Sequence, residues 1–142
     1  MKDAEWVAAL LRHGLLRGSF IPDRSQRELR ELVRYRRTLV RQRAQVVNRM
    51  QKVMEGANIK LSSVATNIVG ASGRAMLEAI SKGIDDPQAL AALARGSLRG
   101  KRPALEEALQ GLLGPHQRFL LQSQLRHLRF VDEEIAGMDK EI

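Results

Sequence analysis

The feature that most constrains the fold is an uninterrupted helical pattern that runs from Ser25 to about Gly56. Ser25 is a plausible N-cap, and Glu28 stands at the position that completes a capping box. About 30 residues at a rise of 1.5 Å give a helix roughly 45 Å long. We therefore expect one element longer than the helices of ordinary globular domains.

The apolar residues of this segment recur in steps of three, four or seven, and a second apolar row flanks the first. The two rows are Leu29, Leu32, Leu39, Val46, Met50 and Val53, and Val33, Val40, Val47 and Met54. Arg36 and Arg43 stand where a strict heptad requires apolar side chains. The pattern predicts a wide, coiled-coil-like seam rather than a perfect two-stranded zipper.

A second long helix is predicted after Gly114, where Pro115 occupies a favourable first helical position. Its heptad positions are Leu121, Leu125, Leu128, Ile135 and Ile142, with Met138 one residue early. The end of this helix is acidic. If the two long helices pair antiparallel, that acidic end lies near residues 24 to 37, and Asp132 could face Arg36. The pairing could form within one chain or between two chains.

Between the long helices, residues 57–114 are divided by eight glycines and prolines, which predicts a compact head of short helices near 61–69, 73–82, 87–95 and 103–112. Asp86 and Pro87 read as an N-cap and the first helical residue. Residues 3–13 predict a short helix, and residues 14–24 a connector. With five aromatic residues and four prolines, the chain is predicted to be all-α: two long antiparallel, coiled-coil-like helices with a small helical head between them.

The charge is strongly positive, with 24 Lys and Arg against 16 Asp and Glu, a formal charge of +8. Such an excess favours nucleic acid as the partner. The alternative for the long helix is a solvated basic face balanced by the acidic end of the second helix. The candidate nucleic-acid-binding residues are Arg34, Arg36, Arg37, Arg41, Arg43, Arg49, Lys52, Arg74, Arg99, Lys101 and Arg102.

Other classes of site are disfavoured by the composition. There is no cysteine and no apolar run near the roughly 20 residues that span a bilayer. His13, His116 and His127 show no metal-ligand spacing and are interpreted as structural or surface residues. Tyr35, Phe119 and Phe130 are dispersed, which favours packing in a core or interface over a stacking platform for single strands. We expect a cytoplasmic protein with no membrane partner and no small-molecule substrate.

Several stretches resemble DEDD-type insertion-sequence transposases, the one-hundred-and-ten group, also described as bridge-RNA-guided recombinases. The resemblance is carried by Lys2-Asp3-Ala4-Glu5-Trp6-Val7-Ala8, Leu10 to Leu16, Arg27-Glu28-Leu29-Arg30, Arg34-Tyr35-Arg36-Arg37, Asn48-Arg49, Asn58 to Val64 and Gly70 to Met76. The similarity to this family extends over essentially the whole chain and corresponds to its central segment.

The resemblance implies that Asp3 is the fourth acid of a RuvC-like catalytic set that holds a divalent metal such as magnesium, with the other three acids upstream of Met1. A single carboxylate cannot assemble a two-metal centre, so no cofactor and no complete active site are expected in this chain. Without the resemblance, Asp3 is simply a cap of the first helix. Ser62, Ser63 and Ser72 match the middle segment of the family and are not proposed as nucleophiles.

The resulting hypothesis is a transposase segment, with residues 1–24 from the end of the RuvC-like domain, 25–56 the basic helix, 57–114 the head and 115–142 the C-terminal helix. It would form a homodimer through the long helices and bind guide RNA or element DNA. Two alternatives remain: a non-enzymatic coiled-coil scaffold that binds only protein, and a truncated transposase product that inhibits the full-length protein.

Overall fold

A computed structural model describes residues 23–142, and this part of the chain is built from helices and loops without a strand. It contains five α-helices and two short 3₁₀ helices, Leu61–Ser63 and Gly96–Lys101. The α-helices are α3 (Arg24–Gly56), α4 (Ala71–Ser81), α5 (Pro87–Ala91), α6 (Arg102–Ala108) and α7 (Pro115–Glu141). The predicted all-α class is confirmed. The helix predicted for residues 3–13 and the connector at 14–22 lie outside the described residues.

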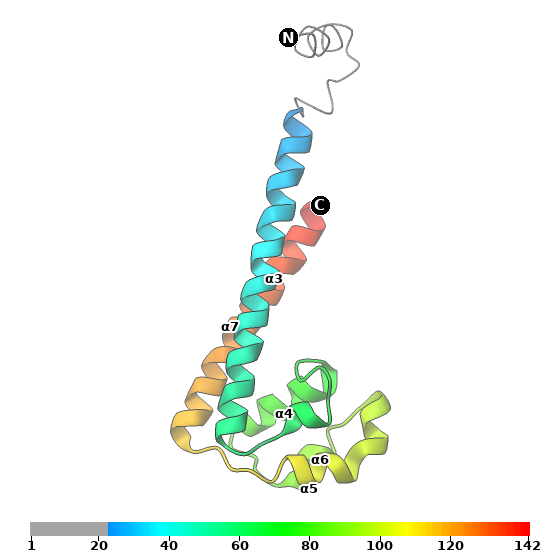
Figure 1. The fold of residues 1–142 in the computed structure, drawn as a ribbon, viewed down its shortest axis with the longest axis vertical. Helices are drawn as coiled ribbons and strands as arrows, with labels where there is room; N and C mark the ends of the chain where they lie inside the picture. The colour runs from blue at the N-terminus through cyan, green and yellow to red at the C-terminus, as the bar shows by residue number, and fades with distance from the viewer. Residues whose placement is uncertain (1–22) are drawn as a thin grey trace, which may run out of the picture.

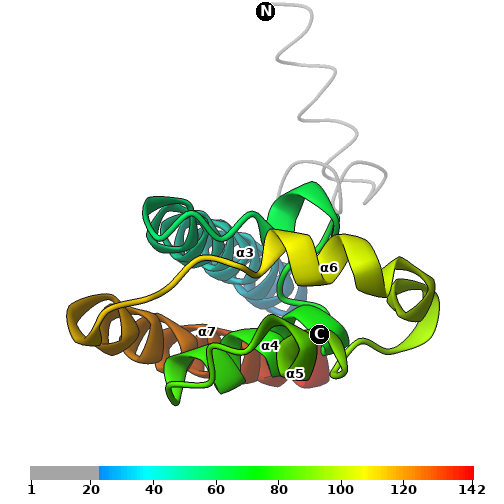
Figure 2. The ribbon, with the colours of Figure 1, turned by 90° about the horizontal axis from the view of Figure 1, so that it is seen from below.

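Helices α3 and α7 lie side by side and antiparallel, and together they form what we call the arm (Figure 1). The segment between them, the head, sits at one end of the arm (Figure 1). Viewed from below, the head helices lie on one side of the arm, with α4 next to α7 (Figure 2). The two long helices therefore pair within one chain. Whether they meet the strict definition of a coiled coil stays a prediction.

Helix α3 has 33 residues and begins one residue earlier than predicted. Its N-cap is Asp23, whose carboxylate accepts a hydrogen bond from the Gln26 backbone N–H at 2.8 Å. The prediction of Ser25 as the cap was wrong, because the aspartate two residues earlier takes that position. Helix α7 begins at Pro115 as predicted, and the Gln117 side chain accepts a hydrogen bond from the Gly114 N–H at 3.0 Å.

The core occupies the head and the half of the arm nearest to it. On α3 the buried members are Val46, Met50 and Met54, and on α7 they are Leu121, Leu125 and Leu128. Further along the arm, Leu29 is 45% exposed and Val40 is 41% exposed. The first predicted row is thus buried from Leu39, which is 3% exposed, toward the head, and the outer end of α3 extends beyond the last turn of α7 (Figure 1).

The head differs in detail from its predicted helices. Residues 61–69 form only the 3₁₀ turn Leu61–Ser63 followed by irregular backbone, so the helix predicted there was wrong. The Asn67 side chain accepts a hydrogen bond from the Val69 N–H at 3.2 Å, which competes with helical backbone bonds. The cap at Asp86 is confirmed, since its carboxylate accepts from the Gln88 N–H at 3.2 Å and Pro87 is the first helical residue.

Candidate nucleic-acid interface

Two of the candidate arginines of α3 lie in the seam between the long helices. Arg36 Nε donates to Asp139 Oδ1 at 2.6 Å, and Arg43 Nε donates to Asp132 Oδ1 at 2.6 Å. The two arginines are seven residues apart, and so are the two aspartates. The pairs therefore fix a single antiparallel register, in which each step along α3 corresponds to one step back along α7.

This register corrects the pairing expected from the sequence. Asp132 does not face Arg36 but Arg43, one heptad nearer to the head. Arg36 instead pairs with Asp139, where the side chains are 41% and 54% exposed. A heptad pattern alone permits shifts of seven residues, because each shift again places apolar side chains opposite one another.

Asp132 also joins the arm to the head. Its Oδ2 accepts a hydrogen bond from Arg74 Nη2 of α4 at 2.8 Å, so one carboxylate holds two guanidinium groups. Partial burial acts to raise the pKa of Asp132, but the hydrogen bonds and charges of Arg74 and Arg43 outweigh it and lower that pKa below its ordinary value. The charges of Arg43 and Arg74 are thus paired with the Asp132 carboxylate within the folded chain.

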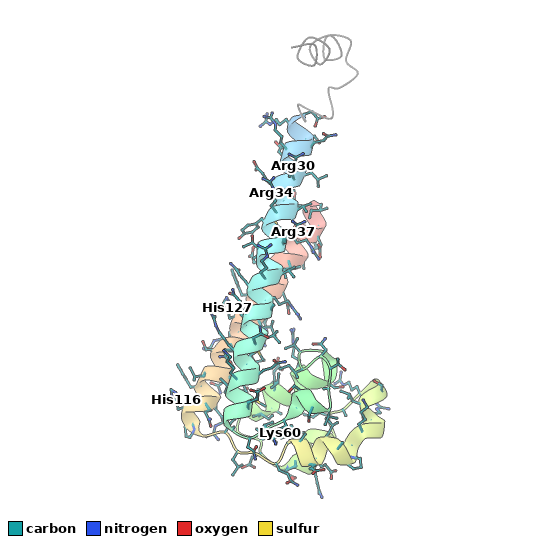
Figure 3. The ribbon with its side chains drawn as sticks, viewed as in Figure 1. Arg30, Arg34, Arg37, Lys60, His116 and His127 are labelled. Carbon is teal, nitrogen blue, oxygen red and sulfur yellow. The ribbon has the colours of Figure 1, made fainter. Side chains whose placement is uncertain are left out.

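The opposite face of α3 carries a second set of cations, which we call the outer row. Its members share one helix face and lie three or four residues apart, except for a step of eight between Arg41 and Arg49: Arg27, Arg30, Arg34, Arg37, Arg41, Arg49 and Lys52. All are exposed, and no ion pair involves any of them within residues 23–142. Arg30, Arg34 and Arg37 extend from the outer half of α3 (Figure 3). No acidic residue occurs between Glu31 and Glu55.

The structure thus divides the predicted residues of α3 into two groups. Arg34, Arg37, Arg41, Arg49 and Lys52 belong to the outer row, whereas Arg36 and Arg43 do not. Sequence reasoning left out Arg27 and Arg30, although Arg30 stands four residues before Arg34 and Arg27 three residues before Arg30, which was a usable signal.

The remaining predicted residues lie in the head. Arg99 and Lys101 are exposed on the 3₁₀ helix Gly96–Lys101. Arg102, at the start of α6, is 3.7 Å from Glu106 Oε1. Arg99 and Arg102 line an open depression of about 310 Å³ together with three alanines. These residues form a separate basic cluster and are not on the face of α3.

The three predicted packing aromatics are all on the surface. Tyr35 is 52% exposed, Phe119 63% and Phe130 58%. Their placement in a core was therefore wrong, and an interface role for them stays a prediction.

His116 and His127 are exposed on α7 (Figure 3), whereas His13 lies outside the described residues.

The predicted metal ligand, Asp3, also lies outside the described residues. Within residues 23–142, no three or more His, Cys, Asp or Glu side chains come together in a way that could hold a metal ion. None of the helices described has the length and apolar character needed to cross a membrane.

Comparison with known proteins finds a similarity over part of the chain. A family model of DEDD transposases of the IS110 type, described as a transposase, matches residues 1–59. The resemblance seen in the sequence is confirmed for this segment, which includes the whole of α3. No curated protein and no solved structure matches the chain.

Proposed function

We propose, from the match of residues 1–59 to the model of IS110-type DEDD transposases, that this chain is a transposase segment that binds nucleic acid along the outer row of α3. The ligand is guide RNA or element DNA. The family supports a transposase-related role, and the outer row supplies the chemistry for binding a phosphate backbone.

The observation that carries this proposal is the separation of cations on the two faces of α3. Arg36 and Arg43 are paired with aspartates in the seam, while the outer row has no acidic residue beside it between Glu31 and Glu55. From Arg27 to Lys52 the row extends roughly 37 Å at 1.5 Å per residue. A solvated face would not require such a separation, whereas a polyanion is attracted by a row of cations that are not paired with carboxylates.

Self-association is part of the same proposal. Leu29, Val33 and Val40 continue the apolar row of α3 beyond the head, and each is at least 38% exposed. A second copy that covers them would remove apolar surface from water. Asp3 would hold a divalent metal only in a full-length protein of the family, together with three further acids, and this part of the proposal is supported by the resemblance to the family.

The test compares two triple variants that remove the same charge. Arg34→Ala/Arg37→Ala/Arg41→Ala removes three members of the outer row, and Lys60→Ala/Lys82→Ala/Arg126→Ala removes three exposed cations elsewhere. Binding to a labelled RNA or DNA of about 20 nucleotides is measured by fluorescence anisotropy over a range of salt concentrations. Circular dichroism checks that both variants fold.

We expect the outer-row variant to bind at least about tenfold more weakly. The slope of log affinity against log salt concentration should fall in magnitude by about two to three, because fewer phosphate contacts form and binding therefore releases fewer counterions. The control variant should change much less. Equal losses in the two variants would show that net charge alone attracts the polyanion. No binding by the unmodified chain at low salt would refute the proposal outright.

A further inference from the structure

Helix α7 exposes two phenylalanines on the face that points away from α3. Phe119 is 63% exposed and Phe130 is 58% exposed, although phenylalanine is among the residues that proteins most often bury. Ser123 and Arg126 lie between them, and the four residues follow in steps of four, three and four. This spacing places all four on one exposed helix face, which we call the α7 face. The side of α7 toward α3 is buried.

A depression of about 360 Å³ opens beside the α7 face, between α7 and α4, which lie next to each other (Figure 2). Its cations are Lys82, Arg126 and Arg129. Its one acid, Glu78, accepts a hydrogen bond from Arg129 Nη2 at 3.3 Å. Lys82 and Arg126 form no ion pair within residues 23–142. Two positive charges of the depression are thus without a counter-charge.

The spacing of the two rings favours a helix as the occupant of the α7 face. Phe119 and Phe130 are eleven residues apart, roughly 16 Å along the helix. Apolar side chains of an amphipathic helix recur at i, i+4, i+7 and i+11, so a helix that lies along α7 can place one beside each ring. A single nucleic-acid strand stacks successive bases on neighbouring rings, and two rings so far apart do not form such a platform.

The charges beside the α7 face indicate an acidic occupant. Carboxylates that lie between the two apolar contacts would face Lys82 and Arg126, for which no described acid of this chain serves as partner. Residues 1–22 carry three Lys and Arg and two Asp and Glu. This stretch has no acidic excess, so the complementary charge has to come from outside residues 1–142.

We propose that the α7 face and the depression beside it bind an acidic amphipathic helix from outside residues 1–142. Its apolar side chains contact Phe119 and Phe130, and its carboxylates pair with Lys82 and Arg126. The inference goes beyond the proposed function and does not depend on it, because the outer row of α3 supplies none of these contacts.

The probes are two fluorescently labelled peptides of about 18 residues, long enough to pass both rings. Both have leucine at i, i+4, i+7 and i+11 in a helix-forming background. One peptide carries glutamates beside the leucines, and the other carries lysines at the same positions. Binding to the full chain is measured by fluorescence anisotropy, and binding of a labelled single-stranded RNA is measured in parallel.

Two pairs of variants separate the apolar contacts from the charges. Phe119→Ala/Phe130→Ala removes the rings, and Leu29→Ala/Val40→Ala is its control, because it shortens two exposed apolar side chains of α3. Lys82→Ala/Arg126→Ala removes the two cations, and Arg34→Ala/Arg37→Ala is its control, because it removes the same charge from the outer row. Circular dichroism checks that all four variants fold.

We expect the unmodified chain to bind the acidic peptide at least about tenfold more tightly than the basic one. The phenylalanine variant should lose about tenfold or more in affinity for the acidic peptide, since aromatic side chains dominate interface energies. The Lys82/Arg126 variant should lose about threefold to tenfold, because its charges are exposed. Both control variants should bind this peptide like the unmodified chain.

Equal binding of the two peptides, or equal losses in the phenylalanine variant and its control, would overturn the inference. So would the absence of acidic-peptide binding at about 1 mM. Weaker binding of the RNA by the phenylalanine variant would instead assign the α7 face to nucleic acid. A lower mass of that variant in light scattering would assign the face to a second copy. Each of these outcomes contradicts the inference, whereas the proposed function is tested separately by the outer-row variants.

Discussion

Gly73 is the third residue of α4 and lies directly against the backbone of Ile68. A β-carbon at this position would stand 2.5 Å from the Ile68 carbonyl carbon and closer still to its oxygen. Because the obstacle is backbone rather than a flexible side chain, it cannot move aside without displacing the loop that precedes α4. The residue therefore has to be glycine for steric reasons, although glycine weakens a helix.

Gly73→Ala should lower the free energy of unfolding by about 1–3 kcal/mol, as expected for overpacking in a well-packed region. Gly137→Ala is the matched change on α7, where a β-carbon would meet nothing within 4 Å. It should raise the free energy of unfolding by about 0.5–1 kcal/mol through helix propensity. Urea unfolding of both variants measures the difference. Stabilisation by both substitutions would contradict the close contact at Gly73.

At the scale of elements, Asp132 connects α3, α7 and α4 through its bonds to Arg43 and Arg74. Its pKa is lowered in the folded chain, so its stabilising contribution is complete above the unfolded pKa of about 3.9. That contribution is lost as the pH falls through the lower folded pKa. We therefore expect the free energy of unfolding to decrease as the pH is lowered below about 4.

Asp132→Asn should reduce this acid dependence and cost about 1–3 kcal/mol near pH 7, because both guanidinium groups lose their carboxylate in a partly exposed site. Urea unfolding at several pH values measures both effects. Glu133→Gln, a change of the neighbouring exposed carboxylate, serves as the control. An Asp132→Asn variant with the acid dependence of the unmodified chain would show that other carboxylates cause it.

The elements differ in how far the sequence could predict them. The long helices follow from local periodicity and from signals such as Pro115, so their limits were predicted closely. The register depends on which of several equivalent heptad shifts is stabilised by ion pairs, and that is a property of two helices together. The register of the two helices was also needed to assign Arg36 and Arg43 to the seam, because only the paired helices show which aspartate faces each arginine. In place of the helix predicted at 61–69, the chain forms the 3₁₀ turn Leu61–Ser63, and the hydrogen bond from the Val69 N–H to the Asn67 side chain opposes helical backbone only at the end of this stretch.

At the scale of the whole molecule, the packing is uneven along the arm. Val46, Met50 and Met54 of α3 belong to the core shared with the head, whereas residues 23–31 are all exposed. An isolated helical segment of this kind is only marginally stable in water, because most helix stability in proteins comes from packing. The outer end of α3 should therefore open independently of the end near the head.

Hydrogen exchange followed by mass spectrometry can measure this gradient. In dilute solution, amides of residues 26–35 should exchange at least about tenfold faster than those of residues 46–54, a difference of about 1.4 kcal/mol or more in opening free energy.

If a second copy covers Leu29, Val33 and Val40 at higher concentration, protection of residues 26–35 against exchange should rise while that of residues 46–54 stays constant. Light scattering on the same samples should show the mass increase from one chain to two. Uniform protection along α3 at the lowest concentration would contradict the gradient, and a constant mass of one chain would contradict self-association.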